Sequence, residues 1–68
     1  MAQKLNNKDY DLISVIYNAS QAVETCSQYM KDADQEGDKE DKQFFSEVQD
    51  TNANLINKGR QLLKSRLA

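Results

Sequence analysis

Few side chains in this chain of 68 residues could do chemistry. Cys26 is its only cysteine, and histidine is absent. A cysteine nucleophile needs a base or a cationic neighbour, so Cys26 is interpreted as a small buried residue. Because no set of nucleophile, base and oxyanion-binding group can be assembled, we expect no catalytic residue and no enzymatic activity.

A run of acids near the middle of the chain resembles the opening of a calcium-binding loop. From Asp32 to Asp38, side chains that carry oxygen alternate along the sequence, and Gly37 is sixth. The match then fails, because Lys39 holds the usually apolar eighth position and Gln43 holds the twelfth, where a bidentate glutamate is needed. We interpret the run as a solvated helix end and hairpin turn, with a calcium site as the alternative, and expect no cofactor.

The basic patch of the chain lies toward its C-terminus, where no acid follows Asp50. Cations at the C-terminal end of a helix stabilise it through the helix dipole. The functional alternative is a surface for RNA or an acidic protein, as in small dimeric hairpin regulators of the Rop type. The net charge of -2 and the pI of 4.9 argue against a general nucleic-acid binder. The patch comprises Lys58, Arg60, Lys64 and Arg66, with Lys4 and Lys8 expected at the same end.

Two long helices are predicted to position these groups. The chain has no proline and only two glycines, so little in it interrupts a helix. Apolar residues recur in alternating steps of four and three, which predicts a first helix over about residues 8–35 with Asn6 as its cap and Asp9 three residues on. A turn over residues 36–38 and a second helix over about 39–66 complete one domain, 1–68.

The predicted turn depends on two residues. Gly37 should end the first helix, because glycine readily adopts the left-handed conformation that closes many helices. Asp38 should then cap the second helix. A short loop forces the two helices to fold back antiparallel, so the fold class is all-α, a two-helix hairpin.

The apolar stripes are too wide for a hairpin alone to bury. Val15, Ala22 and Tyr29 recur every seventh residue beside the stripe of the first helix, while Phe44, Ile56 and Leu63 flank that of the second. We therefore predict a homodimer, with a tetramer as the alternative, in which the hairpins form a four-helix bundle. Its predicted core comprises Leu12, Ile16, Ala19, Val23, Cys26, Met30, Phe45, Val48, Asn52, Leu55 and Leu62.

Counting outward from the turn pairs the residues of the two helices in layers. Met30 should meet Phe44 or Phe45, and Cys26 should meet Val48. Toward the open end, Ala19 should meet Leu55 and Leu12 should meet Leu62.

The two ends of the hairpin are predicted to carry opposite charge. The run from Lys31 to Asp41, with both ends included, contains six acids and two lysines, whereas the basic patch lies at the open end. Antiparallel hairpins would place each acidic turn beside a basic end, and parallel hairpins would bring like charges together. Exposed ion pairs are weak, so charge is expected to select the orientation of the dimer rather than to create it.

Asn52 occupies a stripe position where an apolar residue would pack better. A buried asparagine can specify register and subunit number at some cost in stability, and this is the favoured interpretation. The alternative is a polar pocket for a small ligand, shared with Thr51 and Gln49.

An apolar helix with Tyr29, then Gly37, then Phe44-Phe45 opening a second helix resembles half of a ferritin-like bundle, the rubrerythrin branch in particular. It is also similar to small uncharacterised bacterial hairpin proteins. The resemblance covers roughly Leu12 to Leu63. It implies a di-iron site with one glutamate on the first helix and a Glu-x-x-His pair on the second.

This chain departs from that family at the implied metal ligands. The resemblance places the first ligand at Gln21 or Ala22, and the pair at Thr51 with Asn54 or at Asn52 with Leu55. None of these is a carboxylate or a histidine, so the metal chemistry looks lost. The acids that could serve only after a shift in register are Glu24, Glu47 and Asp50.

The function expected from these features is that of a non-catalytic interaction or structural module whose outer faces or ends bind another protein. Residual metal binding and RNA binding are the alternatives. The first seven residues do not resemble a signal peptide, and no stretch approaches the roughly 20 apolar residues that span a bilayer. We expect a cytoplasmic protein with no membrane partner, in agreement with a single unpaired cysteine.

Overall fold

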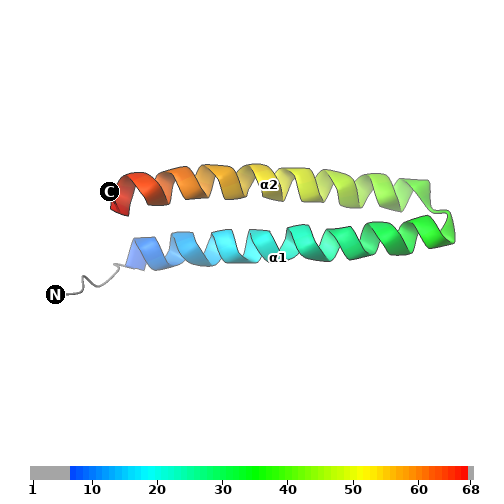
Figure 1. Cartoon of the computed structure of the whole chain (residues 1–68), viewed down its shortest axis with the longest axis horizontal. Coiled ribbons are helices and arrows are strands. Elements are labelled where there is room, and N and C mark those ends of the chain that lie inside the picture. Colours follow the sequence, from blue (N-terminus) through cyan, green and yellow to red (C-terminus); the bar gives the residue numbers. More distant parts are fainter. Residues whose placement is uncertain (1–6, 68) are drawn as a thin grey trace.

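The computed structural model describes residues 7–67, and these form two long antiparallel helices with no strand. Helix α1 is Asn7–Glu36 and helix α2 is Lys39–Leu67. Figure 1 shows the two helices side by side along their whole length, with the turn at one end. The predicted all-helical hairpin is confirmed, and the helix ends lie within one residue of the predicted ones. The proposed cap Asn6 lies outside the described residues.

The turn between the helices is closed by backbone hydrogen bonds. Gly37 has a φ of 71°, in the left-handed region. The N–H of Gly37 donates to the carbonyl of Asp34 at 3.1 Å, and that of Asp38 donates to the carbonyl of Ala33 at 2.9 Å. This pair of bonds is the Schellman arrangement, in which carbonyls at the end of a helix find donors. The prediction that Gly37 ends the first helix is confirmed.

Asp38 begins the second helix as predicted. Its Oδ1 accepts a hydrogen bond from the backbone N–H of Asp41 at 3.0 Å, and its carbonyl accepts one from the N–H of Lys42 at 3.1 Å. The carboxylate therefore satisfies a backbone donor that has no partner inside the helix. One residue thus belongs to the end of α1 and to the start of α2, which keeps the loop short and the helices antiparallel.

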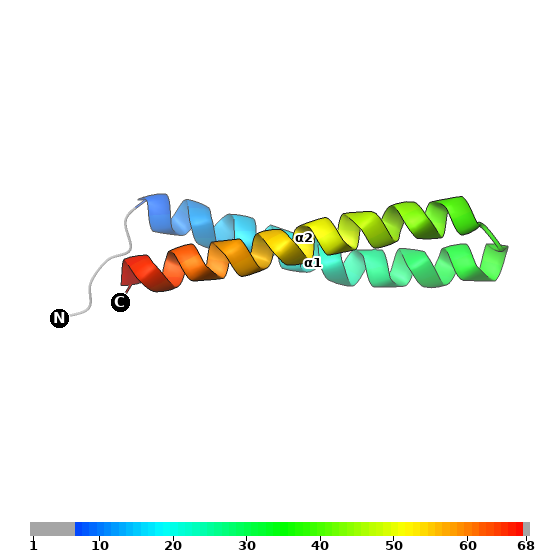
Figure 2. The same cartoon turned by 90° about the horizontal axis from the view of Figure 1, so that it is seen from above.

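The contact between α1 and α2 is built on small residues. On α1 the buried apolar side chains are Ala19, Cys26 and Ala33, and on α2 Gly59 is buried. A Cβ added to Gly59 would lie 2.7 Å from Cγ1 of Ile16, so the helices approach closely at this level. No large apolar side chain in the described part of the chain is fully buried. Figure 2 shows the helices crossing near their middle.

Two further contacts fix the levels at which the helices meet. The rings of Tyr29 and Phe45 lie with their centroids 5.3 Å apart. The Nε2 of Gln49 donates to the carbonyl of Val23 at 2.9 Å and to Oγ of Ser27 at 2.8 Å. These levels agree with the counting outward from the turn.

The face that α2 turns toward α1 differs from the predicted one. Gln49, rather than Val48, reaches across to α1 beside Cys26, and Gly59, rather than Leu62, lies against Leu12 and Ile16. The predicted layers Ala19–Leu55 and Leu12–Leu62 place the wrong side of α2 against α1. Leu55 and Leu62 are each 48% exposed. Their neighbours Ile56 and Leu63, predicted as flanking residues, are the less exposed ones. A difference of one residue rotates the contact face by about 100°.

Candidate interaction face

The rotation of α2 leaves one side of the hairpin apolar and uncovered. On α2, residues spaced by three, four and seven positions share a side of the helix, and the same holds on α1. Phe44 is 61% exposed and Val15 is 59% exposed, far more than a residue of a buried core. We call this side the open face; its residues are Val15, Ala22 and Tyr29 on α1 and Phe44, Val48, Leu55 and Leu62 on α2.

The aromatic rings show that the two halves of the open face lie on the same side of the hairpin. Phe45 contacts Tyr29 of α1, with centroids 5.3 Å apart, and also contacts its neighbour Phe44, with centroids 5.9 Å apart. The three rings form a continuous row from α1 across the interhelical contact to the outer side of α2. The open face is therefore one surface that spans both helices.

The exposed area of the hairpin is larger than that of a compact monomer. Its accessible surface is 5655 Å². A compact protein of 7.8 kDa exposes about 4,400 Å² by the usual scaling of area with mass.

Two hollows lie along the open face. The turn hollow lies near the turn and is lined by Tyr29, Asp32, Ala33, Glu36, Asp41 and Phe45. The second lies on the outer side of α2 and is lined by Phe44, Glu47, Val48, Thr51 and Asn52. Both combine apolar side chains with carboxylates.

The structure separates the three residues of the predicted polar pocket. Thr51 and Asn52 line the second hollow, but Gln49 points to α1 and binds Val23 and Ser27. The Nδ2 of Asn52 donates to the carbonyl of Val48 in its own helix at 2.9 Å. Asn52 is partly buried rather than enclosed, and its amide is satisfied without a partner on α1.

The acids at the turn are poorly neutralised. Among residues 7–67 the one ion pair joins Lys42 Nζ to Asp34 Oδ1 at 2.8 Å. The neighbouring Asp38, and to a smaller extent Glu36 and Glu40, raise the pKa of Asp41 above its usual value. Like charges at this end therefore repel one another in the isolated hairpin.

The four residues of the basic patch are all exposed, but they do not form one surface. Arg60 and Lys64 line a polar depression with Asn57 and Gln61. Lys58 lies beside Leu62, and helix geometry places Arg66, four residues after Leu62, on that same side. Lys4 lies outside the described residues, and Lys8 is exposed at the open end.

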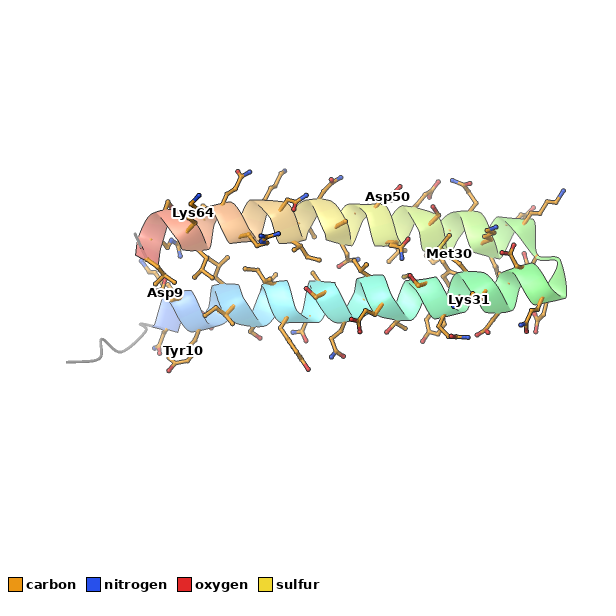
Figure 3. The ribbon with its side chains drawn as sticks, viewed as in Figure 1. Asp9, Tyr10, Met30, Lys31, Asp50 and Lys64 are labelled. Atoms are coloured by element: carbon orange, nitrogen blue, oxygen red, sulfur yellow. The ribbon has the colours of Figure 1, made fainter. Side chains whose placement is uncertain are left out.

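The proposed metal ligands do not form a site. Glu24, Glu47 and Asp50 are all exposed, and Figure 3 shows Asp50 pointing away from α1. No group of three or more histidine, cysteine, aspartate or glutamate residues in the described part could hold a metal ion. The residues present thus do not fit the di-iron site that the ferritin-like resemblance implies.

The calcium-loop interpretation also disagrees with the backbone. α1 continues through Glu36, so the acids from Asp32 to Glu36 are helical rather than part of a loop. Alternate residues of a helix point to nearly opposite sides, and their oxygens cannot converge on one cation. Cys26 is buried as predicted, with its thiol free.

Sequence reasoning missed Gln49 as a residue that joins the helices, whereas the stripe predicted for the second helix already included Gly59, which the structure buries against Ile16. For Gln49, the available signal was a polar residue among apolar neighbours. No helix in the described part of the chain combines the length and the apolar character needed to cross a membrane.

Comparison with known proteins adds no relative. No family model matches the chain, and neither the curated proteins nor the solved structures include a match.

Proposed function

We propose that the chain is a non-catalytic interaction module that self-associates through its open face into a four-helix bundle. The observation that carries the proposal is the imbalance between its two surfaces. The buried apolar residues of the hairpin contact are small, whereas Val15, Phe44, Leu55 and Leu62 are about half exposed or more. A chain this short gains too little from such a contact, and a second copy offers the missing apolar surface.

The spacing of the residues on the open face supports a second copy of the chain as the partner that covers it. A two-fold interface places the same patch on both partners, so its residues must be complementary to themselves. Val15 and Tyr29 are each seven residues from Ala22, and Phe44 and Leu62 are each nine residues from Ala53, which is the middle of α2. A two-fold axis near the middle of the hairpin would therefore pair aliphatic with aromatic side chains.

The remaining surface suits contacts with another protein. Tyr10 and Tyr17 are exposed on α1, outside the open face, and Figure 3 shows Tyr10 pointing away from α2. Exposed tyrosines supply contact area together with a hydrogen-bonding group, which is common at protein interfaces. A cytoplasmic location belongs to the same proposal, since a reducing compartment keeps the Cys26 thiol free.

The test compares two substitutions that start from equal exposure. Phe44 and Tyr17 are each 61% exposed, but only Phe44 belongs to the open face. Phe44→Glu would place a charge in the dimer core and should weaken association at least about tenfold, or about 1.4 kcal/mol. Tyr17→Glu should leave association nearly unchanged.

Sedimentation velocity over a dilution series measures both variants and the unmodified chain. Circular dichroism at the same concentrations reports whether each variant remains helical. A monomeric unmodified chain, or equal effects of the two substitutions, would contradict the proposal.

A further inference from the structure

The turn hollow has the chemistry of a receptor for a planar cation. Tyr29 and Phe45 provide aromatic rings, and Asp32, Glu36 and Asp41 provide carboxylates around them. A guanidinium group stacks on aromatic rings and binds carboxylates through two parallel hydrogen bonds. Rings and carboxylates together therefore favour arginine.

Among the described residues, no cation pairs with the carboxylates that line the turn hollow, although Asp32 accepts a hydrogen bond from Nε2 of Gln28 at 3.0 Å. Lys42 pairs with Asp34, which is not one of the lining residues. Asp38, and to a smaller extent Glu36 and Glu40, place negative charge near the carboxylate of Asp41 and raise its pKa. A cation entering from outside would relieve this repulsion.

Arg66 is the exposed arginine of the described chain that lies on the correct side of α2. It follows Leu62 by four residues, so both lie on the side of the open face. Lys64 follows Leu62 by two residues and lies with Arg60 on another side, beside Asn57 and Gln61. Arg66 has no ion-pair partner among the described residues.

The level of Arg66 matches that of the turn hollow when two hairpins overlap in opposite directions. α2 contains 29 residues, with Ala53 at its middle. An axis at that level brings Leu62 opposite Phe44 of the second copy. The same axis brings Arg66 opposite residue 40, next to Asp41, which lines the turn hollow.

We propose that the turn hollow of each hairpin receives Arg66 of a second copy, so that the two hairpins pack antiparallel. This inference rests on the proposed self-association and adds its orientation and the residue that determines it. In the opposite, parallel arrangement, the two acidic turns would lie together and each Arg66 would lie near another cation.

The orientation can be measured directly with one spin label per chain. Gln35 is exposed and lies next to the turn. A chain with Gln35→Cys and Cys26→Ala carries a single thiol for the label. At the helical rise of 1.5 Å per residue, antiparallel hairpins place the two labels about 40 Å apart, whereas parallel hairpins bring them within about 20 Å. Double electron–electron resonance distinguishes these distances.

Charge exchange tests the role of Arg66. Arg66→Glu should raise the dissociation constant of the dimer about tenfold, and Asp41→Arg should act in the same direction. The chain that carries both substitutions should regain most of the affinity, because each hollow would again meet an opposite charge. Lys64→Glu is the matched control: it makes the same change in charge two residues away and should have a much smaller effect.

The outcomes separate this inference from the proposed function. A short distance between labels in a dimer would overturn the antiparallel orientation and leave self-association standing. Equal effects of Arg66→Glu and Lys64→Glu, or no recovery in the double variant, would overturn the assignment of Arg66. A chain that remains monomeric would overturn both proposals.

Discussion

At the scale of single residues, the approach of the two helices depends on the absence of a side chain at Gly59. Glycine inside a helix costs up to about 1 kcal/mol relative to alanine. Here the backbone of α2 lies against Ile16, and a Cβ would fall 2.7 Å from Cγ1 and 3.1 Å from Cδ1 of that side chain. At Gly59 the loss of helix propensity is thus offset by a close contact between the helices. This contact determines which side of α2 faces α1.

Gly59→Ala should therefore lower the stability of the hairpin, although alanine is the better helix former. Overpacking typically costs about 1–3 kcal/mol, and helix propensity returns up to about 1 kcal/mol, so we expect a net loss of about 1 kcal/mol. Urea unfolding at one protein concentration measures the loss.

Ile16→Ala in the same chain removes both clashing carbons and should make Gly59→Ala favourable. Gly37→Ala is a control: its φ of 71° strains any side chain, but nothing lies within 4 Å of the added carbon. Ile16→Ala should give no such rescue at Gly37. A rise in stability on Gly59→Ala alone would show that the helices do not approach as closely as described.

At the scale of elements, the turn determines where α1 ends and where α2 begins. Gly37 closes α1 through its left-handed backbone, and the carboxylate of Asp38 caps α2 through the N–H of Asp41. Gln49 adds a bridge between the helices by donating to Val23 and Ser27. Repulsion between like charges opposes this arrangement, because the carboxylate of Asp38 that caps α2 also raises the pKa of Asp41.

Asp38→Ala should lower stability by about 1 kcal/mol, the usual loss for a helix cap. Asp38→Asn is its control, because asparagine keeps an oxygen acceptor for the N–H of Asp41 while it removes the negative charge. We expect Asp38→Asn to be as stable as the unmodified chain or slightly more stable, since repulsion among the turn acids falls. Thermal unfolding followed by circular dichroism compares them, and equal losses in both variants would show that the carboxylate does not act as a cap.

At the scale of the whole molecule, the hairpin has two unlike sides. One is the open face, with the aromatic row of Tyr29, Phe45 and Phe44 near the turn. Another carries Asn57, Arg60 and Lys64. Such a division is usual in a subunit of a helical bundle. The proposed self-association predicts that the stability rises with protein concentration.

Asn52 provides a test at this scale, because it is a polar residue between Val48 and Leu55 of the open face. Its amide donates to Val48 within α2, so no partner is required to satisfy it. Asn52→Leu should raise the stability of the assembly and can change its subunit number, as expected for an asparagine that specifies register. Unfolding together with sedimentation equilibrium measures both. Lower stability with an unchanged dimer would contradict the proposed role of Asn52.

The sequence by itself determined the elements of this protein. The absence of proline, the heptad spacing and the pair Gly37-Asp38 predicted two helices and their turn, because these signals are local. The axial levels also followed, since a short turn forces residues at equal distances from it to lie near one another.

Only the tertiary structure decided which edge of the wide stripe on α2 faces α1. Periodicity predicts how wide an apolar stripe is and on which side of its helix it lies. It does not predict which edge of a wide stripe contacts the other helix, because edges about 100° apart match the pattern equally well. The choice depended on interactions across the helices: the close approach of Gly59 to Ile16 and the reach of Gln49 to Val23 and Ser27. That rotation placed Leu55 and Leu62 on the open face, because the hairpin contact has room for only one edge of the stripe.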